Sequence, residues 1–216
     1  MNGFSDFWGQ TDNVGRAVAL LMLLMSVMSW ALIIWKTWVL RRVAADVPRA
    51  LDAFWAAPDW ALARDRLSAL DREGVLLPLL DAAQARELEG SLATGASGAA
   101  QLTRRLRQAL QASLAHLRMG QVWLASVGST APFIGLFGTV WGIYHALVEM
   151  SLSGAVTVDK VSGPVGEALI MTAVGLAVAI PAVLGYNLLG KWVGAAEEQL
   201  EGFAYDLLTV LSERDR

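Results

Sequence analysis

Three long runs without a charged residue stand out along the chain. They cover residues 17–35, 119–148 and 168–190 and contain 19, 30 and 23 residues. As helices they would extend about 28, 45 and 34 Å, against a hydrocarbon core of about 30 Å. Apolar runs of about 18 residues or more are typical of membrane spans. The pattern predicts an all-α polytopic membrane protein with three transmembrane helices, the second of which protrudes at one end.

Basic residues predict which side of the membrane each segment occupies. Of the 17 Lys and Arg residues, 12 lie between Lys36 and Arg118, and basic segments are retained in the cytoplasm. Tryptophans at the inner ends of the spans would form an interfacial belt, although this residue is also common in cores: Trp35, Trp38, Trp123 and Trp192. The predicted segments are an N-terminus on the outer side (1–16), transmembrane helix (17–38), cytoplasmic helical domain (39–118), transmembrane helix (119–148), outer-side loop (149–166), transmembrane helix (167–190) and cytoplasmic C-terminal helix (191–216).

The segment between the first two spans is predicted to form a small helical domain. Prolines, glycines and one Asp N-cap mark the ends of its helices. The expected helices cover residues 43–57, run from the cap Asp59 to about Arg72, and run from Pro78 to Glu89. A flexible break is expected at residues 90–98. An apolar stripe from Leu102 to Leu117 follows. Because no proline intervenes before Pro132, we expect one long helix from about Ala100 into the second span. Long helices would thus extend into the cytoplasm.

The C-terminal segment carries a heptad-like apolar seam. Its members alternate spacings of three and four: Val193, Ala196, Leu200, Phe203, Leu207 and Val210. The seam could pack within the chain or seal against a neighbouring subunit, and the pattern fits both readings.

Small residues recur on one face of each of the last two spans. The second span has Ala131, Gly135, Gly138 and Gly142, and the third has Ala168, Thr172, Gly175 and Ala179. Such faces allow helices to approach closely in lipid, so the four glycines are predicted helix-packing residues. We expect residues 163–166, which include Pro164, to form the turn into the third span.

Glu167 is the ionisable residue at the mouth of the third uncharged run. A carboxylate in hydrocarbon costs about 2.5–3.5 kcal/mol on insertion scales and usually serves ion or proton handling. Thr139 and Thr172 offer hydroxyl groups among small residues, although a buried Thr often bonds its own helix backbone. For His145, near the outer end of the second span, a structural hydrogen bond is the favoured role over a proton relay.

Composition and the absence of known catalytic motifs narrow the classes of function that the chain could have. The chain has no Cys, and its net charge of -3 gives no sign of nucleic-acid binding. No His pair has metal-ligand spacing, no glycine loop suits a nucleotide, and Ser126 and Ser129 lack a catalytic partner, so we expect neither enzyme nor cofactor. A passive membrane scaffold would explain the glycines but not Glu167. The first ten residues contain only Asp6 as a charge, which favours a retained span over a cleavable signal peptide.

Two motifs resemble a known family. Residues 128–143, GSTAPFIGLFGTVWGI, resemble the second span of the ExbB/TolQ/MotA proton-channel family. Residues 163–176, GPVGEALIMTAVGL, followed by AIPAV at 179–183 and Tyr186 and Asn187, resemble its third span. MotA-type members have four spans, so the three spans here favour the ExbB and TolQ branches. The Gly-Pro-Val-Gly-Glu sequence at residues 163–167 is closer to ExbB.

This resemblance implies a bacterial inner-membrane motor subunit. Five copies would surround a pair of helices from ExbD, a single-span partner that carries the proton-binding aspartate. Proton flow would act on TonB and energise import across the outer membrane. The resemblance also implies that Glu167, Thr139 and Thr172 face the lumen. The alternative is a TolQ-like subunit of the Tol-Pal envelope system.

Overall fold

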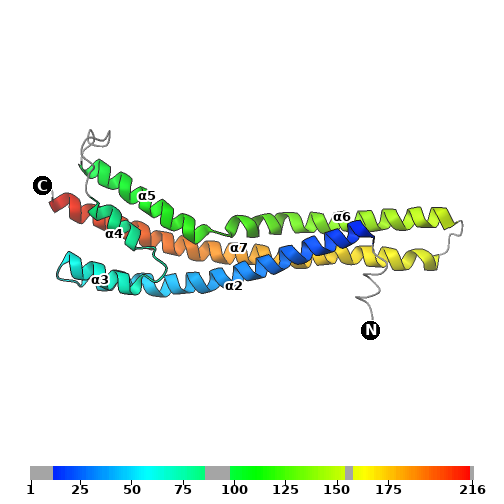
Figure 1. The fold of residues 1–216 in the computed structure, drawn as a ribbon, viewed down its shortest axis with the longest axis horizontal. Coiled ribbons are helices and arrows are strands. Elements are labelled where there is room, and N and C mark those ends of the chain that lie inside the picture. Colours follow the sequence, from blue (N-terminus) through cyan, green and yellow to red (C-terminus); the bar gives the residue numbers. More distant parts are fainter. Residues whose placement is uncertain (1–11, 86–97, 154–157, 215–216) are drawn as a thin grey trace. The chain divides into compact units, whose positions relative to one another are not determined.

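The computed structural model describes residues 12–85, 98–153 and 158–214, which form helices and no strand (Figure 1). The helices are α2 (Asn13–Trp55), α3 (Trp60–Leu70), α4 (Leu77–Gln84), α5 (Gly98–Arg118), α6 (Gln121–Ser153) and α7 (Val158–Arg214). Of these, α2, α6 and α7 each contain a stretch long and apolar enough to cross a membrane. The predicted all-α, three-span class is confirmed.

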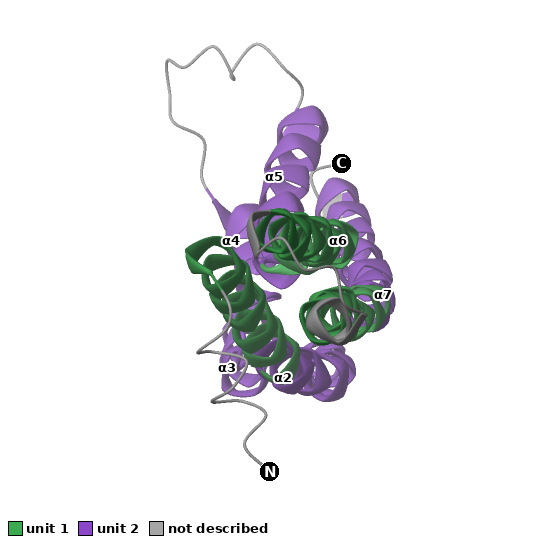
Figure 2. Ribbon diagram, turned by 90° about the vertical axis from the view of Figure 1, so that its right-hand side faces the viewer, with its two compact units in different colours: residues 1–34, 120–187 green, residues 35–119, 188–216 purple. Residues whose placement is uncertain are grey.

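The chain divides into two compact units (Figure 2). Unit 1 comprises residues 1–34 and 120–187, and therefore contains the start of α2, all of α6 and the first part of α7. Met22, Ala131 and Ala182 are fully buried between these helices. The outward faces remain apolar, with Leu23 60%, Phe133 71% and Leu184 63% exposed. Such a surface requires lipid or other protein around it.

Unit 2 comprises residues 35–119 and 188–216 and has a leucine-rich core. In the C-terminal part of α7, five of the six seam residues are buried: Val193, Ala196, Leu200, Phe203 and Leu207. The Phe203 ring meets the Phe54 ring of α2 edge to face, with centroids 5.2 Å apart. The seam therefore packs within the chain, whereas Val210, at its end, is 40% exposed.

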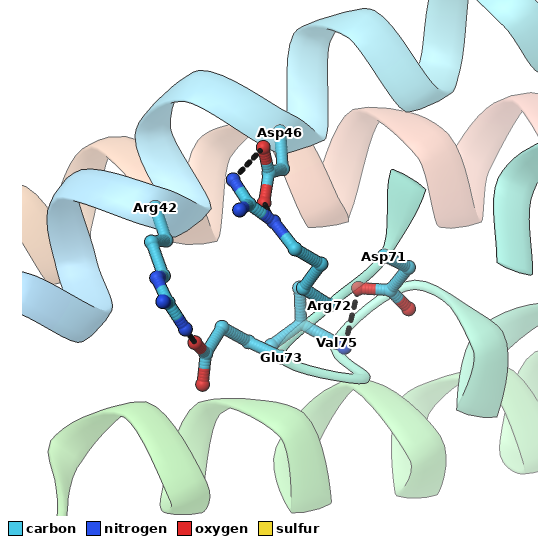
Figure 3. Close-up of polar contacts among 6 residues, drawn as sticks. All are labelled: Arg42, Asp46, Asp71, Arg72, Glu73 and Val75. Atoms are coloured by element: carbon cyan, nitrogen blue, oxygen red, sulfur yellow. Dashed lines mark hydrogen bonds and ion pairs between the residues drawn. The ribbon is translucent and has the colours of Figure 1, made fainter. Parts of the chain in front are cut away.

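Carboxylates begin the two short helices of unit 2. The side chain of Asp59 accepts the Leu62 N–H at 2.8 Å, which confirms the predicted N-cap of α3. Asp71 accepts the backbone N–H groups of residues 75–77 at 2.8–2.9 Å (Figure 3 draws the bond to Val75). These bonds satisfy amides that have no partner inside α4.

Two ion pairs attach the turn before α4 to α2 (Figure 3). Arg72 donates to both carboxylate oxygens of Asp46, at 2.8 and 2.9 Å. The hydrogen bond and the charge of Asp46 raise the pKa of Arg72, so the guanidinium stays charged at any physiological pH. Arg42 pairs with Glu73 at 3.5 Å. The bidentate geometry makes the Asp46 pair the stronger of the two.

The predicted continuous helix from Ala100 into the second span is wrong. Helix α5 ends at Arg118 and α6 begins at Gln121, and between them Gly120 has a φ of +89°. Glycine adopts this backbone conformation at low cost and so allows the break. Within unit 2, the Lys36 ammonium donates to the carbonyl oxygens of His116 (2.8 Å) and Leu117 (3.3 Å). It thereby adds a charged donor at the end of α5, where carbonyls lose their intrahelical partners, although the His116 carbonyl also accepts the Met119 N–H at 3.3 Å.

The predicted turn at residues 163–166 is also wrong, because α7 already runs from Val158 and includes Pro164. Pro164 therefore lies inside the helix, where proline removes one backbone hydrogen bond although its φ is compatible with a helix. Other predicted bounds shift: the 43–57 segment is the end of α2, which continues through Pro48 to Trp55, α3 ends at Leu70, and α4 ends at Gln84. Glu89 and most of the 90–98 break lie outside the described residues.

Candidate functional site

The α6–α7 contact in unit 1 is built around two glycines. A Cβ added to Gly135 would stand 2.7 Å from the carbonyl oxygen of Met171, and one on Gly175 would stand 2.7 Å from that of Ala131. Either distance is shorter than real Cβ contacts. Glycine is therefore required at both positions for the two backbones to lie this close.

Two further glycines of α6 line the same contact with less constraint. A Cβ on Gly142 would approach the Ala168 Cβ to 2.9 Å. A Cβ on Gly138 would lie 3.2 Å from side-chain atoms of Met171 and of Val18 in α2. All four glycines named from the sequence thus face a neighbouring helix of unit 1.

Thr139 and Thr172 meet between α6 and α7. The Thr139 hydroxyl contacts the Thr172 hydroxyl and lies 3.1 Å from the carbonyl oxygens of Gly135 and Ala168. Because a hydroxyl has one proton, Thr139 can donate to one carbonyl while it accepts from Thr172. Thr139 is 6% exposed and Thr172 is half-buried. The backbone bond considered from the sequence is therefore present, together with a side-chain bond between the helices.

Glu167 lines a cavity of about 330 Å³ in unit 1. Three other ionisable side chains line the same cavity: Asp12, which precedes α2, and His145 and Glu149 of α6. Gly138, Gly142 and Ala168 form part of its apolar wall. The cavity thus gathers three carboxyl groups and one imidazole in unit 1.

Asp12 is the most firmly held of these carboxylates. One oxygen accepts the Gly15 N–H at 2.8 Å, as an N-cap of α2 would, and the other accepts the Trp141 indole N–H at 2.6 Å. Burial raises the pKa of Asp12, but these hydrogen bonds and the charge of protonated His145 outweigh it and lower that pKa overall. Asp12 is thus held in its ionised form.

Aromatic rings support Trp141 from both sides along α6. Its indole stacks on Phe137 and on the His145 imidazole, each with centroids 6.3 Å apart. Tyr144 lies beside it at 6.0 Å. The stack fixes the direction of the indole N–H and places His145 next to the Asp12–Trp141 bond.

The structure separates the polar residues named from the sequence into two groups. Glu167 lies in the cavity, whereas Thr139 and Thr172 form the inter-helix pair and are not among the cavity residues. Sequence reasoning missed Asp12, Trp141 and Glu149. A signal existed for Asp12, since an Asp directly before an apolar run is a typical N-cap. Its bond to Trp141, 129 positions away, had none.

Comparison with known proteins identifies relatives along nearly the whole chain. A model of the MotA/TolQ/ExbB proton channel family matches residues 79–202. The biopolymer transport protein ExbB of Xanthomonas campestris pv. campestris (strain B100) is 40% identical over 207 residues, covering 90% of this chain and 80% of that protein. ExbB of Neisseria meningitidis serogroup A is 37% identical over 217 residues, covering 94% and 95%. The Tol-Pal system protein TolQ of Haemophilus influenzae is 30% identical over 224 residues, covering 96% and 93%.

Three helices long and apolar enough to cross a membrane, with a cavity lined by ionisable groups in unit 1, define a multi-pass membrane protein with ionisable groups among its helices. The extent of the match makes the assignment specific. The chain belongs to the MotA/TolQ/ExbB proton channel family.

Proposed function

We propose that this chain is an inner-membrane subunit that, with an ExbD-like single-span protein, converts proton-motive force into work on a TonB-like protein. That work would energise import across the outer membrane. Relatives named biopolymer transport protein ExbB, at 37–40% identity over most of the chain, support this branch of the family. One elementary charge crossing 100 mV releases about 2.3 kcal/mol, so mechanical output needs several protons.

The cavity position of Glu167 is the observation that carries the proposal. A carboxylate packed only for structure would be expected to have an Arg or Lys partner. Among the Arg and Lys side chains that the structure describes, none forms an ion pair with Glu167, while Asp12, His145 and Glu149 share its cavity. A group in this setting can exchange protons with water on the outer side and set the local field for a passing proton.

The threonine pair supplies polar contacts deeper in the helices. In the proposed complex, the two threonines serve the partner's aspartate as it changes protonation, but Thr139 lies buried between α6 and α7 and does not itself face the lumen. Thr172 is the more exposed of the two, so it would make the direct contact. Thr139, which contacts the Thr172 hydroxyl, would orient it.

A lumen needs several copies of unit 1, and we propose five. The exposed apolar side chains of α6 and α7 would be covered by neighbouring copies and by lipid: Phe133, Leu136, Val140, Leu169, Ile170 and Ile180. The basic segment after the first span supports an orientation with that segment and the C-terminus in the cytoplasm and the N-terminus in the periplasm.

The test is energised uptake of an iron–siderophore complex by cells whose only copy of the gene carries Glu167→Gln. We expect uptake to fall at least tenfold while the amount of complex purified with the partner stays unchanged. Glu198→Gln is the matched control, because Glu198 is an exposed residue of the same helix. Normal uptake by the Glu167 variant would contradict the proposal.

A second candidate is a TolQ-like role in envelope integrity, favoured by the 30% identity to TolQ over 96% of the chain. Purification through a tag on this chain distinguishes the two. Recovery of an ExbD-like and a TonB-like protein supports the first role, and recovery of Tol-Pal components supports the second.

A further inference from the structure

The Asp12 carboxylate differs from the other acids around the Glu167 cavity in how it is held. Asp12 comes from the residue before α2, whereas Glu149 and Glu167 come from α6 and α7. Its two oxygens have separate N–H donors, at 2.6 and 2.8 Å. No such donor is given to the carboxylates of Glu149 or Glu167 by any described residue.

Among the side chains that the structure describes, those of α6 and α7 bring ionisable groups to this carboxylate. His145 and Glu149 face it from α6 and Glu167 from α7. Arg16 follows one turn later in α2, and its backbone N–H bonds the Asp12 carbonyl oxygen at 3.0 Å. Asp12 is thus a negative charge bound at one end of the cavity, with one imidazole and two acids beside it.

We propose that Asp12, oriented by Trp141, is a positioning residue that keeps a permanent negative charge at the Glu167 cavity and so sets the pH range over which the cavity takes up protons. This inference rests on the proposed proton-driven function. A fixed anion favours the protonated forms of groups near it. An ionised Asp12 would therefore draw protons to the cavity at a higher external pH than a neutral residue in its place.

The lowered pKa of Asp12 agrees with this role, because a group that remains ionised cannot compete for the incoming proton. The geometry also explains why the donor is an indole. The Trp141 N–H has no acid–base chemistry in the physiological range, so it remains a donor to Asp12 as the external pH changes.

The test is the pH profile of proton flux into proteoliposomes that contain the complex purified with its partner. Asp12→Asn keeps an oxygen for the Trp141 N–H but removes the charge. We expect its profile to shift to lower pH by roughly half a unit, with the maximum flux retained. Asp12→Glu retains the charge and should restore most of the profile. Trp141→Phe loses the N–H and should give an intermediate shift.

Asp52→Asn is the matched control, since Asp52 is an exposed residue of α2 in unit 2 and its loss changes net charge equally. Coincident profiles for wild type and Asp12→Asn would overturn the inference. If Asp12→Asn fails to assemble, an unshifted Trp141→Phe profile overturns it. The Glu167→Gln variant distinguishes failure of the proposed function from failure of this inference. Full proton flux in Glu167→Gln would contradict the proposed function. If Glu167→Gln blocks flux but the pH profile of Asp12→Asn is unshifted, only this inference fails.

Discussion

At the scale of single residues, the close contact between α6 and α7 depends on glycines, which have no side chain. Gly135 and Gly175 bring two backbones together because neither carries a Cβ. The close approach also brings the Thr139 hydroxyl within reach of the Ala168 carbonyl oxygen of the facing helix. Packing and polar chemistry at this contact are therefore linked.

Gly175→Ala should destabilise the protein by about 1–3 kcal/mol, because its Cβ would meet the backbone oxygen of Ala131. Thermal unfolding of the complex in detergent measures the change. Gly194→Ala is the control: an added Cβ there meets nothing within 4 Å, and alanine favours a helix by about 1 kcal/mol. Equal melting temperatures for the two variants would show that the contact is not as close as described.

Residue identity alone revealed part of this site. The spacing of the glycines and the isolation of Glu167 in an uncharged run are visible in the sequence. The cavity is not, since its ionisable residues come from α6, α7 and the residue before α2, and Asp12 bonds a residue 129 positions away. Helical spacing indicates a face of a helix but not which other helix lies against it.

At the scale of elements, the break between α5 and α6 shows how one glycine ends a helix. Gly120 has a φ of +89°, and a Cβ on it would lie 3.1 Å from a Leu32 side-chain atom in unit 1. Gly74 has a similar φ of +65°, but its added Cβ would meet nothing within 4 Å. The two glycines thus share a conformation and differ in surroundings.

Gly74→Ala should lower the free energy of unfolding by about 1–2 kcal/mol, because a left-handed backbone conformation is unfavourable for a residue with a Cβ. Gly120→Ala should cost at least as much, because the Leu32 side chain must also move. Melting temperatures of both variants in the same detergent test the order. A Gly120→Ala variant as stable as wild type would mean that α5 and α6 join as the continuous helix that the sequence predicted.

Element boundaries were the least predictable part of the fold, for a physical reason. A glycine inside an apolar periodic run costs a helix only about 1 kcal/mol, so the sequence cannot tell Gly120, which breaks a helix, from Gly135, which does not. The same holds for proline: Pro164 was predicted to mark a turn and lies within α7. In both cases tertiary contacts decide what local preference leaves open.

At the scale of the whole molecule, the exposed apolar surface indicates that lipid or other protein surrounds the chain. Large side chains on all three helices of unit 1 remain exposed, among them Ile34 at 65% and Val140 at 59%. Lipid can cover such a surface, and so can another copy of the chain. The fold class and the family were both predictable at this scale, because long apolar runs and two motifs can be recognised in the sequence without a structure.

Native mass spectrometry of the purified complex should count the copies in steps of 23.2 kDa. We expect five copies of this chain with two of the single-span partner, and five after the partner is removed. A single copy in every preparation would leave no shared lumen for Thr172 and would rule out the proposed arrangement.

Lys36 has a consequence for how the protein is made. Its side chain is 3% exposed, and its acceptors, the carbonyl oxygens of His116 and Leu117, lie 80 and 81 positions further along the chain. A ribosome therefore exposes this lysine long before the atoms that receive its ammonium exist. Until those residues emerge, the ammonium must stay hydrated, and the start of unit 2 cannot reach its final packing while translation of α5 is unfinished.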